Sequence, residues 1–308
     1  MTGRVMPVVF VLMAIQAPTP VTVTVDARAL APGELVVLTI ATHEPAGAVH
    51  VRAFDQDWPA FAVDDRTWRA IVGIDLDVAP GEHRVGVRVD SRSGPERRTE
   101  TLSVEPRTFR TRTLTVDPAF VNPPEQVQAR IAAEATELDR LWRSSNPAPY
   151  WTGAFVRPVP HEANSAFGTR SIFNGQARSP HGGADFLSPA GTPVASPGAG
   201  RVLLARDRYY TGGSVVIDHG AGLISLFAHL SSIDVAPGDL IEAGQPVGKV
   251  GATGRVTGAH LHWTLRASGT RVDPLSLLHV LGAGRQASAR HPLPILNHSI
   301  SRSSINHQ

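Results

Sequence analysis

Residues 260–265 read His260-Leu261-His262-Trp263-Thr264-Leu265 and alternate between polar and apolar side chains. Alternate residues of a β-strand share one face, so this pattern predicts a strand whose apolar face packs into a core. The opposite face would then project His260 and His262 together into a cleft. Two histidines can simply decorate a strand, but the fixed apolar face favours a shared chemical role for them.

A second pattern lies upstream and reads His181-Gly182-Gly183-Ala184-Asp185. The even spacing lets His181 and Asp185 share a face in extended chain, and the glycines between them allow the backbone to bend. This spacing alone occurs by chance in many proteins. Together with the His-x-His strand, it offers the nitrogen and carboxylate donors of a catalytic zinc site with an open position for water.

Composition narrows the kinds of site that the chain can contain. Its 308 residues include 13 histidines and no cysteine, so any metal must be bound by histidine or carboxylate. Disulfides, iron–sulfur clusters and cysteine nucleophiles are excluded on the same ground. The net charge is only +2, without a basic block, so we expect no nucleic-acid partner.

The N-terminus has the pattern of a secretory signal peptide over residues 1–17. A short start with one arginine precedes an apolar run from Val5 to Ile15, and a small residue, Ala17, comes before a proline. A membrane anchor is the alternative, but the run is shorter than the roughly 20 residues that span a bilayer. We therefore expect an exported protein, in the periplasm or outside the cell, without a stable membrane span after processing.

The length suggests about two domains, and the residue patterns divide the chain further. Residues 21–116 hold short alternating runs separated by Pro-Gly and Gly-Pro turns, which predict an immunoglobulin-like β-sandwich. Residues 122–145 begin with two prolines and continue with apolar residues at helical spacing, which predicts a linking α-helix. Residues 150–281 are β-rich, and the polar residues 283–308 are expected to form a disordered tail.

Four motifs together resemble the M23 family of zinc endopeptidases, the lysostaphin or LytM type. They are Phe167-Gly168-Thr169-Arg170, His181-x-x-x-Asp185, Phe227-Ala228-His229-Leu230 and His260-x-His262. The resemblance covers about residues 150–281 and implies an antiparallel β-sheet peptidase domain. It also implies an enzyme that hydrolyses peptide bonds in the stems or cross-bridges of peptidoglycan.

The resemblance assigns roles to particular residues. It implies that zinc is bound by His181, Asp185 and His262, and that His229 and His260 form the catalytic pair. Arg170 and Asn174 lie in the segment before the first ligand, where family members shape the substrate groove, so we expect them to contact substrate.

Two further positions are compared with the family. His219, in an Asp-His-Gly turn, is expected to be structural. Phe227 stands where many members have tyrosine, so a substrate contact through that hydroxyl would be lost.

Two other functions remain open from the sequence. Glu242-Ala243-Gly244-Gln245-Pro246-Val247-Gly248-Lys249 resembles the fold of biotinyl and lipoyl carrier domains, in which one lysine on a hairpin holds the cofactor. Lys249 is the only lysine, but it lies within an expected strand rather than at a turn. A non-catalytic wall binder or regulator that keeps the fold and the zinc is the second alternative, although the complete set of ligands and histidines favours an enzyme.

Overall fold

The computed structural model describes residues 21–115, 121–164 and 167–283. The expected signal peptide and all but the first residue of the expected tail lie outside these ranges. The described chain is mainly β with antiparallel sheets, which confirms the predicted fold class. Within these ranges, no helix combines the length and the hydrophobicity needed to cross a membrane.

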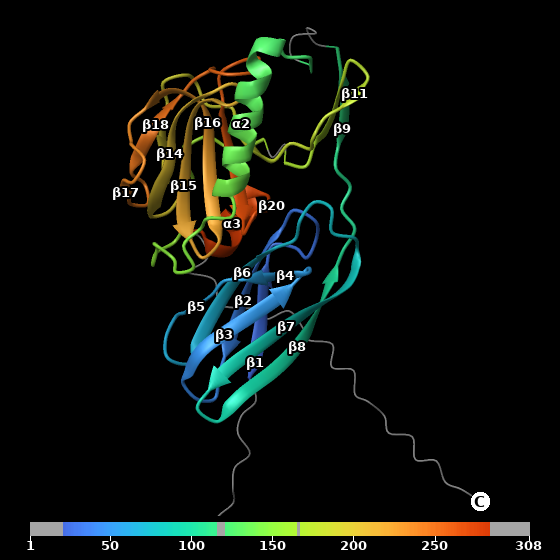
Figure 1. Cartoon of the computed structure of the whole chain (residues 1–308), viewed down its shortest axis with the longest axis vertical. Coiled ribbons are helices and arrows are strands. Elements are labelled where there is room, and N and C mark those ends of the chain that lie inside the picture. The colour runs from blue at the N-terminus through green and yellow to red at the C-terminus, as the bar shows by residue number, and fades with distance from the viewer. Residues whose placement is uncertain (1–20, 116–120, 165–166, 284–308) are drawn as a thin grey trace, which may run out of the picture.

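The N-terminal part consists of two four-stranded sheets packed on each other, in the lower half of Figure 1. One sheet has the order β1-β2-β6-β5 and the other has the order β4-β3-β7-β8. Their bounds are β1 Thr22–Ala27, β2 Leu35–Ala41, β3 Ala46–Ala53, β4 Gln56–Trp58, β5 Ala60–Ala62, β6 Thr67–Gly73, β7 Gly81–Ser91 and β8 Gly94–Val104. Strand β7 illustrates the pattern, because Val85, Val87 and Val89 are buried while Arg88 is exposed.

The next strand, β9 (Thr111–Leu114), leaves the sandwich. It pairs in parallel with β10 (Arg170–Phe173), which forms a hairpin with β11 (Gln176–Ala177), so the three strands make a separate small sheet. Figure 1 shows this sheet beside the C-terminal part, away from the helices. The range expected for the sandwich therefore includes one strand that pairs elsewhere.

Helix α2 (Glu125–Leu141) follows Pro123 and Pro124 and has a glutamate in its first turn, as a helix N-terminus favours. Its last turn packs Leu141, together with the following Trp142, against a face of the large C-terminal sheet that includes Val216. Figure 1 shows the helix lying along this sheet. The C-terminal end of the predicted apolar stripe thus packs against the domain, whereas Val127 and Ile131 are only half-buried.

The C-terminal part is a nine-stranded sheet with the main order β12-β19-β16-β15-β14-β17, to which β13, β18 and β20 are attached. Its strands are β12 Gly183–Phe186, β13 Pro193–Ala195, β14 Gly200–Arg208, β15 Gly212–Gly220, β16 Leu223–Ile233, β17 Leu240–Ile241, β18 Pro246–Val250, β19 Leu261–Ala267 and β20 Thr270–Val272. Strand β19 has Leu261, Trp263 and Leu265 fully buried, which is the apolar face predicted from the alternation.

The two parts are joined through the C-terminal helix α3 (Pro274–Leu281), which contacts β1 and β2. The Ser276 hydroxyl accepts a hydrogen bond from the Leu35 amide at 3.0 Å, and the guanidinium of Arg271 pairs with Asp75. One apolar cluster runs through both parts. The sandwich is therefore packed onto the sheet that carries the candidate site.

Candidate active site

Three neighbouring strands bring the predicted residues together. In the antiparallel pair β12–β19, Asp185 lies directly opposite His262, and in the pair β16–β19, His262 lies opposite Ala228. His229 is the next residue along β16. Because opposite residues of paired strands share a face, the strand register alone places the carboxylate and His262 side by side.

Three donor atoms form a compact triangle. Nε2 of His181 lies 3.2 Å from Oδ1 of Asp185 and 3.1 Å from Nδ1 of His262, and that Nδ1 lies 2.8 Å from the same Oδ1. Zinc bonds of about 2.0–2.2 Å in a tetrahedron would space their donor atoms roughly 3.3 Å apart. The three predicted ligands thus converge with nearly the separation that one zinc ion requires.

Two further features fit a metal at this position. Nε2 of His262 lies 2.9 Å from the Thr264 hydroxyl, which can accept its proton and so free Nδ1 to act as a ligand. Burial favours a higher pKa for Asp185, but its hydrogen bonds with both ligand histidines outweigh this and hold the pKa well below its usual range. An ionised carboxylate and two imidazoles are a donor set typical of catalytic zinc.

His229 is held in an unusual backbone conformation at the rim of the triangle. Its φ is +66°, a left-handed value that is rare for a residue with a side chain, and such values cluster at functional sites. Its Nδ1 donates a hydrogen bond to the backbone oxygen of Thr253 at 2.9 Å. Burial lowers the pKa of His229 to about 4, so the ring is neutral at pH 7 and its Nε2 is a proton acceptor.

His260 faces His229 from the start of β19, with the two ring centres 4.8 Å apart. Its Nδ1 donates to the backbone oxygen of Gly258 at 2.9 Å, and its Nε2 lies 3.9 Å from Oδ1 of Asp185. Both histidines therefore have Nδ1 occupied by a carbonyl and keep Nε2 for chemistry. All five residues predicted to be ligands or catalytic groups meet at one place.

The two residues expected to contact substrate lie on a different element. Arg170 begins β10 and is exposed, and Asn174 occupies the left-handed turn between β10 and β11, with a φ of +49°. The base of this hairpin is connected to the first ligand, because the amide of His181 donates to the Thr169 oxygen at 2.9 Å. Substrate contact by Arg170 and Asn174 stays a prediction.

Two other sequence interpretations can be compared with the structure. His219 is fully buried, with its ring nitrogens bonded to the Ala199 oxygen and the Ser225 hydroxyl, so its role is structural as expected. Burial lowers its pKa to about 4. Lys249 lies inside β18, which pairs with strands on both sides, rather than at the hairpin turn that a carrier domain uses.

Sequence reasoning missed Thr253 and Thr264, which orient site histidines. Thr264 stands on the polar face of the alternating stretch, two residues after His262, so the alternation could have suggested it. Thr253 offered no comparable signal, since its carbonyl reaches His229 from a loop 24 residues further along the chain.

Comparison with known proteins agrees with this geometry. A crystal structure described as a peptidase M23 from Pseudomonas aeruginosa is 32% identical, with a TM-score of 0.64, over 83% of this chain and 97% of that one. The chain belongs to peptidase family M23. The model of Peptidase family M23 matches residues 179–274, a range that includes all five residues expected to be ligands or catalytic groups.

Curated relatives are similar over about a third of this chain. Peptidoglycan DD-endopeptidase ShyA of Vibrio cholerae is 45% identical over 96 residues, which are 31% of this chain and 22% of that protein. DD-carboxypeptidase/endopeptidase Mpg of Neisseria meningitidis is 39% identical over 97 residues, 32% of this chain and 22% of that protein. The matched part thus spans about a fifth of the length of these relatives.

Proposed function

We propose that this protein is an exported zinc endopeptidase that hydrolyses peptide bonds in the stems or cross-bridges of peptidoglycan. The observation that carries the proposal is the convergence of three side chains that could hold a metal with two histidines whose Nε2 atoms are available. The names of the curated relatives support the wall substrate, and they favour a D-alanyl cross-link over a glycyl bridge. Such a substrate places the protein in the periplasm or at the cell wall.

The residues fit the two proton transfers that peptide hydrolysis requires. Zinc bound by His181, Asp185 and His262 would supply Lewis-acid activation of the scissile carbonyl and of the attacking water. His229 and His260 present Nε2 as a proton acceptor, so one of them takes the proton that the attacking water releases. The histidine that took this proton returns it to the departing amine nitrogen, and the pair helps to stabilise the negative charge that develops on the carbonyl oxygen.

The hydrogen bonds at Nδ1 fix the orientation of the His229 and His260 rings. Because each Nδ1–H is bound to a backbone carbonyl, neither ring can rotate without losing a hydrogen bond. The imidazoles are therefore oriented before substrate arrives, which lowers the cost of reaching the reactive geometry.

The test is digestion of purified peptidoglycan sacculi with the full chain, followed by mass analysis of the released fragments. We expect new amino termini that disappear after treatment with a chelator and return with added zinc. His260→Ala should lower the rate by about 100-fold or more, the range for loss of a general acid or base. His83→Ala, which changes a half-buried histidine of the sandwich, is the matched control and should retain the rate of the unmodified protein.

A zinc-loaded protein that releases no fragment would overturn the proposal. The non-catalytic wall binder would then be the better interpretation. The masses of the fragments also decide which bond is cut, because cleavage of a D-alanyl cross-link and cleavage of a glycyl bridge leave different residues on each product.

A further inference from the structure

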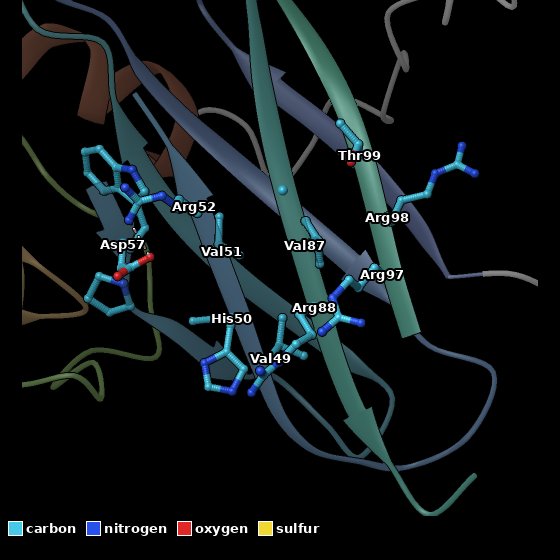
Figure 2. Close-up of a pocket in the computed structure, with 14 residues that line it drawn as sticks. Val49, His50, Val51, Arg52, Asp57, Val87, Arg88, Arg97, Arg98 and Thr99 are labelled. Carbon is cyan, nitrogen blue, oxygen red and sulfur yellow. Dashed lines mark hydrogen bonds and ion pairs between the residues drawn. The ribbon is translucent and has the colours of Figure 1, made fainter. Parts of the chain in front are cut away.

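The outer face of the sandwich sheet β4-β3-β7-β8 carries a hollow of about 570 Å³, shown in Figure 2. Apolar atoms make up much of its lining, although valines such as Val51 and Val87 point mainly into the sandwich core. The volume is within the range of about 300–1,000 Å³ that is typical of small-molecule sites. Its lining comes from regular strands and is therefore rigid.

Strand register sets a row of basic side chains across this hollow. His50 of β3 lies directly opposite Arg88 of β7, and Arg88 lies directly opposite Arg97 of β8. Figure 2 shows Arg97 extending toward Arg88, whereas the side chain of Arg98, which also lines the hollow, extends in the opposite direction. Like charges placed directly opposite each other destabilise an antiparallel pair, so this row has a cost that an anion between the guanidinium groups would relieve.

The acidic groups of this face only partly balance the positive charge of its arginines. Asp90 bonds both Arg88, at 2.9 Å, and His50, at 3.1 Å, and Asp57 bonds Arg52 at 3.2 Å. These carboxylates are exposed, so their pairs are weak and can exchange for another anion. Arg97 forms no ion pair with any residue in the described ranges, and its guanidinium is therefore available to a ligand.

Gly86 makes the hollow possible. It lies on the outer face of β7, between Arg52 and Thr99 of the neighbouring strands, where a side chain would fill the space. A Cβ added there would meet only one atom, the Arg52 oxygen at 3.9 Å, so crowding does not require the glycine. Glycine weakens a strand interior, and its presence there often marks the close approach of a ligand.

We propose that this face is a second binding site, separate from the catalytic histidines, for the free carboxylates of peptidoglycan stem peptides. The proposal rests on the proposed function for its choice of ligand. Stem peptides carry carboxylates at intervals along an otherwise compact chain, which suits a row of two arginines and a histidine beside an apolar hollow. Arginine binds carboxylate through two parallel hydrogen bonds, and such charge-assisted bonds are stronger than neutral ones. The sandwich would thus hold the wall while the large sheet acts on it.

The test separates binding from stability. Arg97→Glu places an opposite charge beside Arg88, so we expect a higher denaturation midpoint. We also expect the affinity for sacculi, measured by co-sedimentation, to fall about tenfold, as for the loss of one charged pair. Gly86→Thr should fill the hollow and stabilise the strand, because threonine has a higher β-propensity than glycine. It should lower the affinity for sacculi to a similar extent. Arg66→Glu makes the same charge reversal in the turn between β5 and β6 and is the matched control, with unchanged sedimentation.

The ligand is tested on the wall itself. Sacculi whose carboxylates have been converted to amides should bind the unmodified protein about as weakly as native sacculi bind Arg97→Glu. Equal binding to native and amidated sacculi would overturn the proposal. The proposal would also fail if binding were lost on removal of the attached phosphate polymers and not on amidation of the carboxylates. Sedimentation needs no hydrolysis, so this proposal can fail while the proposed peptidase activity holds. Conversely, an inactive protein that still binds through this face would contradict the activity alone.

Discussion

Individual residues around the triangle of donor atoms decide which atoms would face a metal ion. His262 can present either ring nitrogen, and the hydroxyl of Thr264 at Nε2 selects Nδ1 for the triangle. Thr264 lies outside the triangle, yet it orients the His262 ring that belongs to it. Such outer partners of metal-binding histidines contribute strongly to affinity.

Thr264→Val should therefore weaken zinc binding by about 10- to 100-fold, because valine keeps the shape of threonine but cannot accept the Nε2 proton. Thr264→Ser retains the hydroxyl and should stay close to the unmodified protein. Competition with a chromophoric chelator measures the affinity. An unchanged affinity in the valine variant would mean that the strand register alone orients His262.

For single residues, the sequence predicts a position well where the alternation of side chains along a strand decides it. The spacings of His181, Asp185, His260 and His262 predict a shared site because alternate residues of a strand share a face. The left-handed backbone of His229 could not be predicted in this way, since a histidine gives no local indication of a positive φ. The roles expected for Arg170 and Asn174 stay predictions for a related reason, because tertiary pairing with β9 decides where their hairpin lies.

At the scale of elements, α2 is held to the sheet by charge as well as by apolar packing. The side chain of Arg208 in β14 is only 3% exposed, and it pairs with Glu137 of the helix at 2.7 Å. Arg208 also donates to the backbone oxygen of Glu134. A buried guanidinium that loses its carboxylate is costly, so this contact is more important than the exposed ion pairs nearby.

Glu137→Gln should lower the free energy of unfolding by about 2–3 kcal/mol, because Arg208 would stay buried without a counter-charge. Asp207 also pairs with an arginine, but its side chain is 70% exposed. Asp207→Asn should therefore change the free energy of unfolding by less than about 0.5 kcal/mol. Urea unfolding of both variants gives the comparison. Equal losses would show that the helix is held by its apolar end alone.

The elements differ in how far the sequence predicts them. Long alternating or helical runs, such as β7 and α2, are clear from periodicity. Strand β9 is different, because four residues carry little periodic signal and its partner β10 lies far along the chain. The Arg112 side chain reaches the Ser171 hydroxyl 59 residues away, so only the folded chain defines this strand.

Over the whole molecule, a charged cluster joins the sandwich to the peptidase sheet. The side chain of Glu34, only 3% exposed, accepts hydrogen bonds from both Arg28 and Arg107 at 2.6 Å. Arg28 also reaches the fully buried Asp273 at 2.8 Å, just before α3. Because the apolar cluster is continuous as well, the two parts depend on each other for stability.

We therefore expect a single cooperative unfolding transition by calorimetry for the intact protein. Glu34→Gln should reduce its stability by about 3 kcal/mol and separate the transition into two, since two arginines lose their shared carboxylate at the interface. Glu82→Gln, at an exposed position of the sandwich, serves as the control. Two transitions in the unmodified protein would contradict the coupling.

The contact between Arg28 and Asp273 also affects when folding of the chain can be completed. It connects residues 245 positions apart, and at about 5–20 residues per second a ribosome needs roughly 10–50 s to make the chain between them. During this interval β1 and β2 exist without α3, the helix that later covers them. Folding of the chain is thus completed at its C-terminal helix, and a nascent chain stopped before residue 273 would expose apolar strand surface to other proteins.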